Sequence, residues 1–245
     1  MGKNFRLVIE YDGSAYHGWQ RQKDRRTIQG EIEKALSTIT CRPVVLIGSG
    51  RTDAGVHALG QVANFTCDTD LTADIFHRGL NRMLPGDIVV HSCGPAEDSF
   101  HARYDAKSKT YRYHILNDRQ PAAIGRQYVW QIRQGLDTEA MGRAARGIVG
   151  EHDFKAFEGS GSPRSSTIRN VLRTEVRQTG KMVFFEIEAT GFLRYMVRNI
   201  VGTLVEVGLG KLSPRDFNMI LDSRDRRNAG FTAPPRGLFL VAVAY

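Results

Sequence analysis

The sequence lacks several features that direct a chain away from the cytoplasm. No apolar run approaches the roughly 18 residues that a membrane-spanning helix needs, and no apolar signal-peptide stretch precedes the first strand pattern. Cysteine is scarce, because Cys41, Cys67 and Cys93 cannot form a complete set of disulfides and none belongs to a Cys-x-x-Cys pair. These absences predict a cytoplasmic protein with reduced thiols, no membrane partner and no bound metal.

The composition is that of a globular protein with a polyanionic partner. Its 245 residues are 41% hydrophobic and 24% charged, which excludes a disordered chain and leaves room for one large domain or two small ones. The 34 Lys and Arg residues outnumber the 26 Asp and Glu residues, for a net charge of +8. Such a positive field favours a polyanion, and nucleic acid is the usual one.

A glycine-rich stretch between two strand patterns carries one cation, one carboxylate and one imidazole. The strand patterns are 44–47 and 61–65. The stretch lacks the Gly-Lys-Ser/Thr ending of a phosphate loop and does not fit the dinucleotide fingerprint. One interpretation is a long hairpin loop in which the carboxylate makes a local turn; the other is a functional site. We expect its glycines, Gly48, Gly50 and Gly55, to adopt positive φ and to approach a ligand closely.

Periodicity predicts two α+β halves. Residues 6–90 alternate as β-α-β-β-α-β, the ferredoxin-like order, and the second half shows a related order without a detectable sequence repeat. We expect an N-terminal half over 1–105 and a C-terminal half over 106–245. Two such halves can join into one continuous mixed or antiparallel sheet with a cleft at their junction.

Three segments interleave aromatic rings with cations. They are residues 16–23, residues 100–109 and the strand pattern 110–116, in which Tyr111 shares a face with Tyr113 while Arg112 lies on the other face. Such segments suit stacking on bases and contact with phosphates. The alternative is that these aromatic rings pack in the protein core.

The stretch Arg51-Thr52-Asp53-Ala54-Gly55-Val56-His57-Ala58 resembles the signature of the tRNA pseudouridine synthase A family. The resemblance runs through nearly the whole chain. Further matching motifs are Tyr11-Asp12-Gly13, Gly18-Trp19-Gln20-Arg21-Gln22, Leu84-Pro85-Gly86-Asp87-Ile88, Phe100-His101-Ala102-Arg103, Tyr111-Arg112-Tyr113, Met196-Val197-Arg198-Asn199 and Gly237-Leu238-Phe239-Leu240-Val241-Ala242-Val243. One departure is Tyr195, which stands where members often have His.

The resemblance implies a homodimeric isomerase, without cofactor, that converts uridine to pseudouridine at positions 38, 39 and 40 of the tRNA anticodon stem-loop. It implies the pseudouridine synthase fold, with a central active-site cleft. It also implies that Asp53 is the catalytic carboxylate, that Arg198 pairs with it, that Tyr111 stacks on the target base and that Arg51 fills the space of the flipped nucleotide.

Other basic residues are candidates for contacts with tRNA. Two other function classes remain open beside the isomerase: an RNA-binding module without catalysis, and a nucleosidase that uses Asp53 for hydrolysis. The candidate RNA contacts are Arg21, Lys23, His57, Arg103, Lys107, Lys109 and Arg112.

Overall fold

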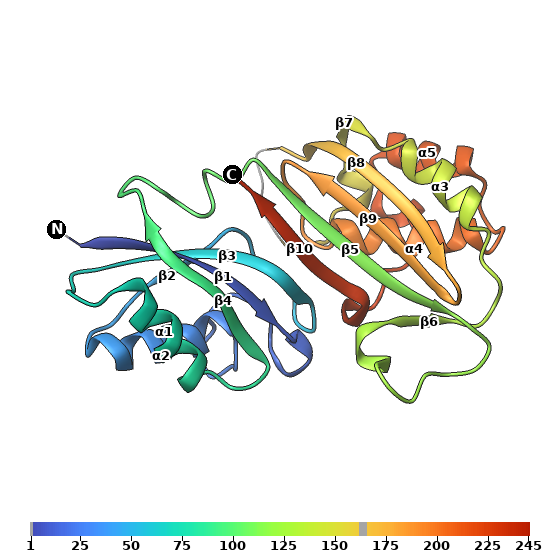
Figure 1. Ribbon diagram of the computed structural model, residues 1–245. Coiled ribbons are helices and arrows are strands. Elements are labelled where there is room, and N and C mark those ends of the chain that lie inside the picture. The colour runs from blue at the N-terminus through green and yellow to red at the C-terminus, as the bar shows by residue number, and fades with distance from the viewer. Residues whose placement is uncertain (1, 162–165) are drawn as a thin grey trace. The chain divides into compact units, whose positions relative to one another are not determined.

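The computed structural model describes residues 2–161 and 166–245 (Figure 1). It divides into two compact units, and the last strand of the chain returns to the first of them. Unit 1 contains the residues up to Lys107 together with Phe239–Tyr245, and unit 2 contains Ser108–Leu238. No helix in the described ranges is long and apolar enough to cross a membrane.

Unit 1 begins with the predicted order of strand, helix, strand, strand, helix and strand. Its strands lie in the order β4-β1-β3-β10, and β2 pairs with β3. Strand β1 is antiparallel to both of its neighbours, whereas β10 runs parallel to β3. The elements of unit 1 are β1 (Lys3–Tyr11), η1 (Gly13–Ala15), α1 (Ile28–Thr40), β2 (Leu46–Gly48), β3 (His57–Cys67), α2 (Ala73–Met83), β4 (Ile88–Ala96) and β10 (Leu238–Ala244).

The core of unit 1 follows from alternation along its strands. On β1, Phe5, Leu7 and Ile9 are buried on one face of the sheet. Helix α1 begins after Thr27, whose side chain accepts a hydrogen bond from the backbone N–H of Gly30 and so caps the helix. Helix α1 contacts α2, and α2 lies against β4.

Unit 2 is built from the strands and helices that lie between Ser108 and Leu238. Its strands lie in the order β5-β9-β8-β7, and β6 pairs with β5. The elements of unit 2 are β5 (Ser108–Asn117), η2 (Arg126–Tyr128), β6 (Trp130–Ile132), α3 (Thr138–Arg146), β7 (Gly150–Asp153), η3 (Lys155–Phe157), β8 (Ile168–Thr179), β9 (Met182–Ala189), α4 (Met196–Gly208), α5 (Pro214–Ser223), η4 (Arg226–Asn228) and η5 (Pro235–Gly237).

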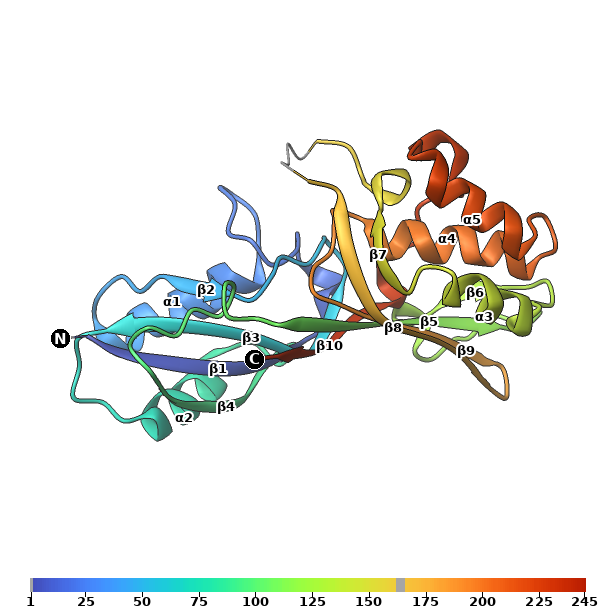
Figure 2. The same cartoon turned by 90° about the horizontal axis from the view of Figure 1, so that it is seen from above.

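The helices of unit 2 cover one face of its strands. Figure 2 shows α4 and α5 on one side of β5 and β9. The hydroxyl of Thr174 on β8 donates to the carbonyl of Ala145 in α3, at 2.9 Å, so α3 covers the same face. Helix α5 begins with a capping box in which Ser213 and Asp216 satisfy each other's backbone N–H groups. The opposite face of β5, β8 and β9 carries charged side chains around the ring of Phe184.

The predicted α+β class with a mixed sheet is confirmed. From β5 onward, with β6, β7 and α5 set aside, the chain again reads strand, helix, strand, strand, helix, strand and ends in β10. The sequence predicted consecutive halves, 1–105 and 106–245. The structure instead assigns β10 to unit 1, where Phe239 pairs with His57 and Leu240 pairs with Ala58.

Candidate functional site

The loop that carries Asp53 is a tight turn in unit 1 between β2 and β3. The backbone N–H of Val56 donates to the carbonyl of Asp53 at 3.1 Å, and Gly55 has a φ of +75°. Thr52 is buried, Asp53 is half-buried and Arg51 is exposed. The turn therefore buries Thr52, buries Asp53 only in part and leaves Arg51 exposed.

A second loop, which follows β1, holds the Asp53 loop by its backbone. The N–H of Trp19 donates to the carbonyl of Thr52 at 3.1 Å, and the N–H of Gly55 donates to the carbonyl of Tyr16 at 3.3 Å. Asp53 thus lies between two residues whose backbone groups are both fixed by the same neighbouring segment. This arrangement preorganises the position of the carboxylate.

The two loops approach so closely that some positions exclude any side chain. A Cβ added at Gly13 would overlap the carbonyl oxygen of Val56, and one at Gly18 would lie 2.6 Å from the carbonyl oxygen of Thr52. Gly18 also has a φ of +89°. The expectation of positive φ is wrong for Gly48 and Gly50, since among the three glycines of the Asp53 stretch only Gly55 has it.

Thr52 is hydrogen-bonded to a buried tyrosine, Tyr11. The hydroxyl of Tyr11 lies 2.7 Å from Oγ1 of Thr52. Burial raises the pKa of Tyr11 far above its usual range, and the hydrogen bond with Thr52 only partly offsets this effect. Tyr11 therefore remains a neutral hydroxyl that positions the residue next to Asp53.

His57 joins the two loops and is not a surface residue. Only 1% of its surface is exposed, and its ring stacks on Phe239 at 4.7 Å. Its Nδ1 lies 3.1 Å from the N–H of Gly13 and 3.0 Å from Oδ1 of Asp12. An unprotonated Nδ1 can accept the hydrogen bond from the N–H of Gly13. Nδ1 can donate to Oδ1 of Asp12 only when it carries a proton. The side chain is buried, so the burial does not support the direct RNA contact predicted for His57, which stays a prediction.

Most of the other predicted contacts in unit 1 are exposed cations. Arg51 donates from Nε to Oε1 of Gln20 at 2.9 Å, which links the Asp53 loop to the aromatic and basic segment after β1. Arg21 pairs with Glu33 at 2.9 Å and keeps 62% of its side chain exposed. The exposed candidates of this unit are Arg21, Lys23, Arg51, Arg103 and Lys107.

Tyr111 lies on the helix-covered face of unit 2. It is 8% exposed, and its ring meets the ring of Phe192 edge to face at 5.0 Å. Tyr113, two residues along the same face, donates its hydroxyl to the carbonyl of Pro234 at 2.7 Å. The ring of Tyr111 is therefore packed within the covered face, with a small part of its surface exposed.

Arg198 is held in the first turn of α4. Its Nε donates to the carbonyl of Ala233 at 2.8 Å, and its guanidinium carbon lies 4.9 Å from the centre of the Tyr195 ring. Its charge lowers the pKa of Tyr113, although burial raises that pKa more strongly. The structure thus brings Arg198 near Tyr113, the neighbour of Tyr111 on the same face of β5.

Tyr195 packs against Arg198, a contact that the sequence did not predict. Its φ is +60°, and its ring lies beneath two guanidinium groups, those of Arg194 at 4.7 Å and Arg198 at 4.9 Å. The sequence contained a signal, since Tyr195 was the one departure from the family pattern. Its contact with Arg198 depends on the left-handed turn before α4, which the sequence pattern does not reveal.

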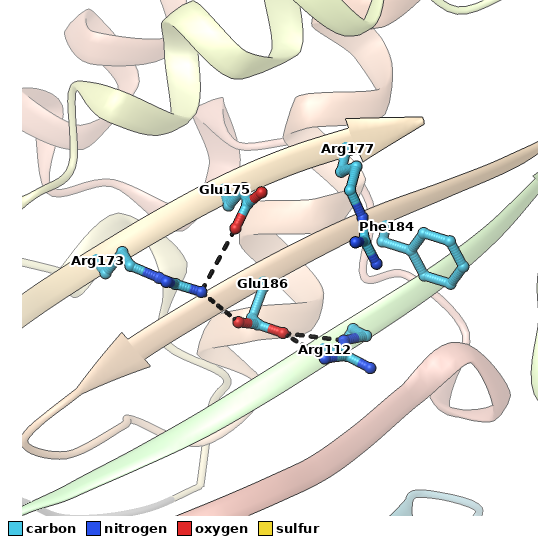
Figure 3. A pocket seen from close by; sticks show the side chains of 6 residues that line it. All are labelled: Arg112, Arg173, Glu175, Arg177, Phe184 and Glu186. Carbon is cyan, nitrogen blue, oxygen red and sulfur yellow. Dashed lines mark hydrogen bonds and ion pairs between the residues drawn. The ribbon is translucent and has the colours of Figure 1, made fainter. Parts of the chain in front are cut away.

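Arg112 lies on the opposite face from Tyr111, in a pocket of about 190 Å³ (Figure 3). The register places Arg112 opposite Glu186 and Glu186 opposite Glu175. Glu186 accepts from Arg112 at 2.8 Å and from Arg173 at 2.6 Å. The residues that line this pocket are Arg112, Arg173, Glu175, Arg177, Phe184 and Glu186.

The charges in this pocket are largely satisfied by one another. Partial burial raises the pKa of Glu186, but the hydrogen bonds and charges of Arg112 and Arg173 outweigh it and lower the pKa. Arg177 lies over the ring of Phe184 at 5.5 Å. The side chain of Arg112 is therefore engaged in an ion-pair network across neighbouring strands. Lys109, the other candidate on β5, is half-buried.

Potential metal ligands are scattered over the fold. In residues 2–161 and 166–245, no group of three or more His, Cys, Asp or Glu side chains could hold a metal ion. The three cysteines are free thiols, and burial raises the pKa of Cys93 to about 12. A thiol with such a pKa is not a reactive nucleophile at neutral pH.

The chain is similar to known proteins over most of its length. A family profile described as tRNA pseudouridine synthase matches residues 7–105 and 144–245. The chain is 49% identical over 243 residues to tRNA pseudouridine synthase A of Acetivibrio thermocellus, which covers 99% of this chain and 100% of that protein. The protein of that name from Thermoanaerobacter sp. matches with the same identity and coverage.

A solved structure shows a much weaker likeness. The crystal structure of a Cbf5-Nop10-Gar1 complex matches with a TM-score of 0.35 and 13% identity, over 82% of this chain and 54% of that chain.

The close contact at Gly13 makes a testable prediction. Gly13→Ala should lower the free energy of unfolding by about 1–3 kcal/mol, because the added methyl group forces the two loops apart. It should also speed hydrogen exchange at the N–H groups of Trp19 and Gly55. Gly86→Ala is the matched control, since a Cβ there meets nothing within 4 Å. Equal stability of the two variants in denaturant titrations would contradict the analysis.

The Glu186 network makes a second prediction, about pH. A carboxylate whose pKa is lowered by folding stabilises the protein above its unfolded-state pKa, and this contribution is lost as pH falls through the folded-state pKa. Glu186→Gln should therefore lower the free energy of unfolding at pH 7. The decrease should be only about 1 kcal/mol, because the network is partly exposed. Urea unfolding of both proteins from pH 7 to pH 3 checks this. A difference that stays constant with pH would show that the charge is not responsible.

Proposed function

The chain belongs to the tRNA pseudouridine synthase family, and we propose that Asp53 is the carboxylate with which it isomerises uridine to pseudouridine in the tRNA anticodon stem-loop. The observation that carries the proposal is the Asp53 turn itself. Its signature residues are fixed by backbone hydrogen bonds on both sides of Asp53, at Thr52 and Gly55, while Asp53 itself is only half-buried.

The reaction requires one bond to break and another to form on the same nucleoside. The C1′–N1 bond of uridine breaks, the uracil turns, C5 bonds to C1′, the proton on C5 is lost to solvent, and N1 takes up a proton, so the product is an isomer of uridine. An ionised carboxylate serves such a reaction by attacking carbon or by stabilising positive charge on the ribose. A single carboxylate suffices because the uracil anion is recaptured by the sugar instead of being released.

A uridine within a stem must leave the helix before it reaches a carboxylate. Flipping costs a few kcal/mol, and side chains that replace the lost stacking offset this cost. We assign these tasks to Arg51, which is exposed and long enough to enter the space of the flipped nucleotide, and to Tyr111, which would stack on the base. Tyr111 is 8% exposed, so only a small part of its surface is open to a ligand.

Arg198 is assigned the role of keeping the Asp53 carboxylate ionised. The assignment rests on the family resemblance. Within unit 2 the Arg198 guanidinium has a fixed position against the Ala233 carbonyl and the Tyr195 ring. A cation beside a carboxylate lowers its pKa and so keeps it ready as a nucleophile at neutral pH.

The remaining parts of the proposal concern the tRNA partner and the assembly. Exposed cations of unit 1 suit phosphate contacts, so we propose this role for Arg21, Lys23, Arg103 and Lys107. Lys109 and Arg112 are weaker candidates, because Lys109 is half-buried and Arg112 is engaged with Glu186. We also propose a homodimer that acts in the cytoplasm without a cofactor.

The function is tested with a tRNA transcript that carries tritium at C5 of uridine. The isomerase should release one tritium per product formed, and mapping should place pseudouridine at positions 38, 39 and 40 of the transcript. A hydrolytic nucleosidase would instead release free uracil, and a binding module would bind the transcript without releasing tritium. Either of those outcomes would refute the proposal.

Arg198→Gln tests the assigned partner of Asp53. The variant should turn over more slowly, and the acidic limb of its pH–rate profile should move to higher pH, because the carboxylate has lost its cation. Arg194→Gln is the matched control, since Arg194 also lies over the Tyr195 ring. It should keep the wild-type profile. An unchanged acidic limb in Arg198→Gln would separate Arg198 from the ionisation of Asp53.

A further inference from the structure

The connection from β4 to β5 presents an aromatic pair to solvent. This segment, drawn in green between the two strands in Figure 1, carries Tyr104, which is 75% exposed. The ring of His101 stacks on the ring of Tyr104 at 4.2 Å with an angle of 30°. The guanidinium carbon of Arg103 lies 5.6 Å from the centre of the same ring. A large ring this exposed contributes little to the core.

The turn that presents Tyr104 is fixed by its own hydrogen bonds. The N–H groups of Tyr104 and Asp105 each donate to the carbonyl of His101 at 3.1 Å. In return, the N–H of His101 donates to Oδ2 of Asp105 at 2.8 Å. Nδ1 of His101 also accepts from the N–H groups of Arg103 and Tyr104, both at 3.2 Å. The imidazole is therefore held in one orientation beneath the Tyr104 ring.

The turn is also anchored to the sheet of unit 1. Ala102 is fully buried, and its N–H donates to Oδ1 of Asn64 on β3 at 2.9 Å. Its carbonyl accepts from the hydroxyl of Tyr245 at 2.6 Å. The carbonyl of Phe100 accepts from Asn4 on β1 at 2.9 Å. Ala102 and the Phe100 carbonyl thus anchor the turn to unit 1, while Arg103, Tyr104 and Asp105 are exposed, so Tyr104 projects from a rigid base.

We propose that His101 and Tyr104 form a stacking platform for an unpaired base of the RNA substrate, with Arg103 beside it to contact the phosphate. The proposal rests on the proposed function, since it takes RNA as the ligand. A rigid exposed ring offers stacking area with little entropy to lose on binding. Stacking on aromatic rings tolerates every base, because each base has a π-face. The platform would therefore hold tRNAs of different sequence equally well.

The test compares dissociation constants of full-length tRNA for three variants. Tyr104→Ala should bind roughly tenfold more weakly, whereas Tyr104→Trp, which keeps a stacking ring, should bind like the wild type. Ile124→Ala is the control, because Ile124 is 94% exposed and its truncation should change nothing. Turnover at saturating tRNA should be equal in all four proteins, because the platform contributes to binding and not to the chemical step.

The salt dependence of binding separates the ring from the cation. Tyr104→Ala should leave the slope of log affinity against log salt unchanged, whereas Arg103→Ala should reduce it by about 0.7–0.9 for one lost phosphate contact. Wild-type affinity in Tyr104→Ala, or equal weakening in Tyr104→Trp, would overturn the proposal. A change in the sedimentation coefficient of Tyr104→Ala would also overturn it, by showing that the ring contacts another protein copy.

These outcomes are distinct from a failure of the proposed function. If the wild-type protein binds tRNA but forms no pseudouridine, the catalytic assignment fails while the effect of Tyr104 on affinity can still be read. If the wild type forms pseudouridine and Tyr104→Ala binds as tightly as the wild type, only the platform is refuted.

Discussion

The structure of the site depends on the contact between two loop backbones in unit 1. The loop after β1 and the loop that carries Asp53 touch through main-chain groups, with no space for a side chain at Gly13. Hydrogen bonds at Thr52, Gly55 and His57 close this contact. Since backbone atoms cannot repack as side chains do, the position of Asp53 is set by the fold of the unit.

Two buried polar side chains near Asp53 hold this contact in place. Tyr11 holds Thr52, and His57 joins the two loops from a buried position. Each is a polar group whose task is to fix a neighbour. A catalytic carboxylate benefits from such support, because orientation established before binding does not have to be supplied by the substrate.

The elements of the fold were predictable because their periodicity is strong. The alternation of β5 placed Tyr111 and Arg112 on opposite faces, and the structure has Tyr111 buried and Arg112 on the polar face. The partners of each face were less predictable, because they come from strands and loops distant in the sequence. Glu186, which engages Arg112, lies 74 residues away, and Ala233, which engages Arg198, lies 35 residues away.

Some features of the site could not be read from residue types at all. The glycines of the Asp53 stretch suggested positive φ. Gly48, however, leaves no room for a Cβ because the ring of Trp19 lies against it. The close contacts between the two loop backbones involve Gly13 and Gly18 of the other loop. The imidazole of His57 suggested an RNA contact. The burial of His57, however, depends on packing against Phe239, near the other end of the chain. Tertiary packing decides such roles, and sequence spacing does not encode it locally.

The most direct test of the account is single-turnover pseudouridine formation by purified Asp53→Asn protein, with tRNA affinity measured on the same sample. The amide is nearly the same size as the carboxylate, so the loop and its backbone hydrogen bonds should persist and tRNA should bind with wild-type affinity. No pseudouridine should form, because an amide cannot act as an anionic nucleophile. Appreciable product from the pure variant would contradict the assignment of Asp53 and the mechanism built on it.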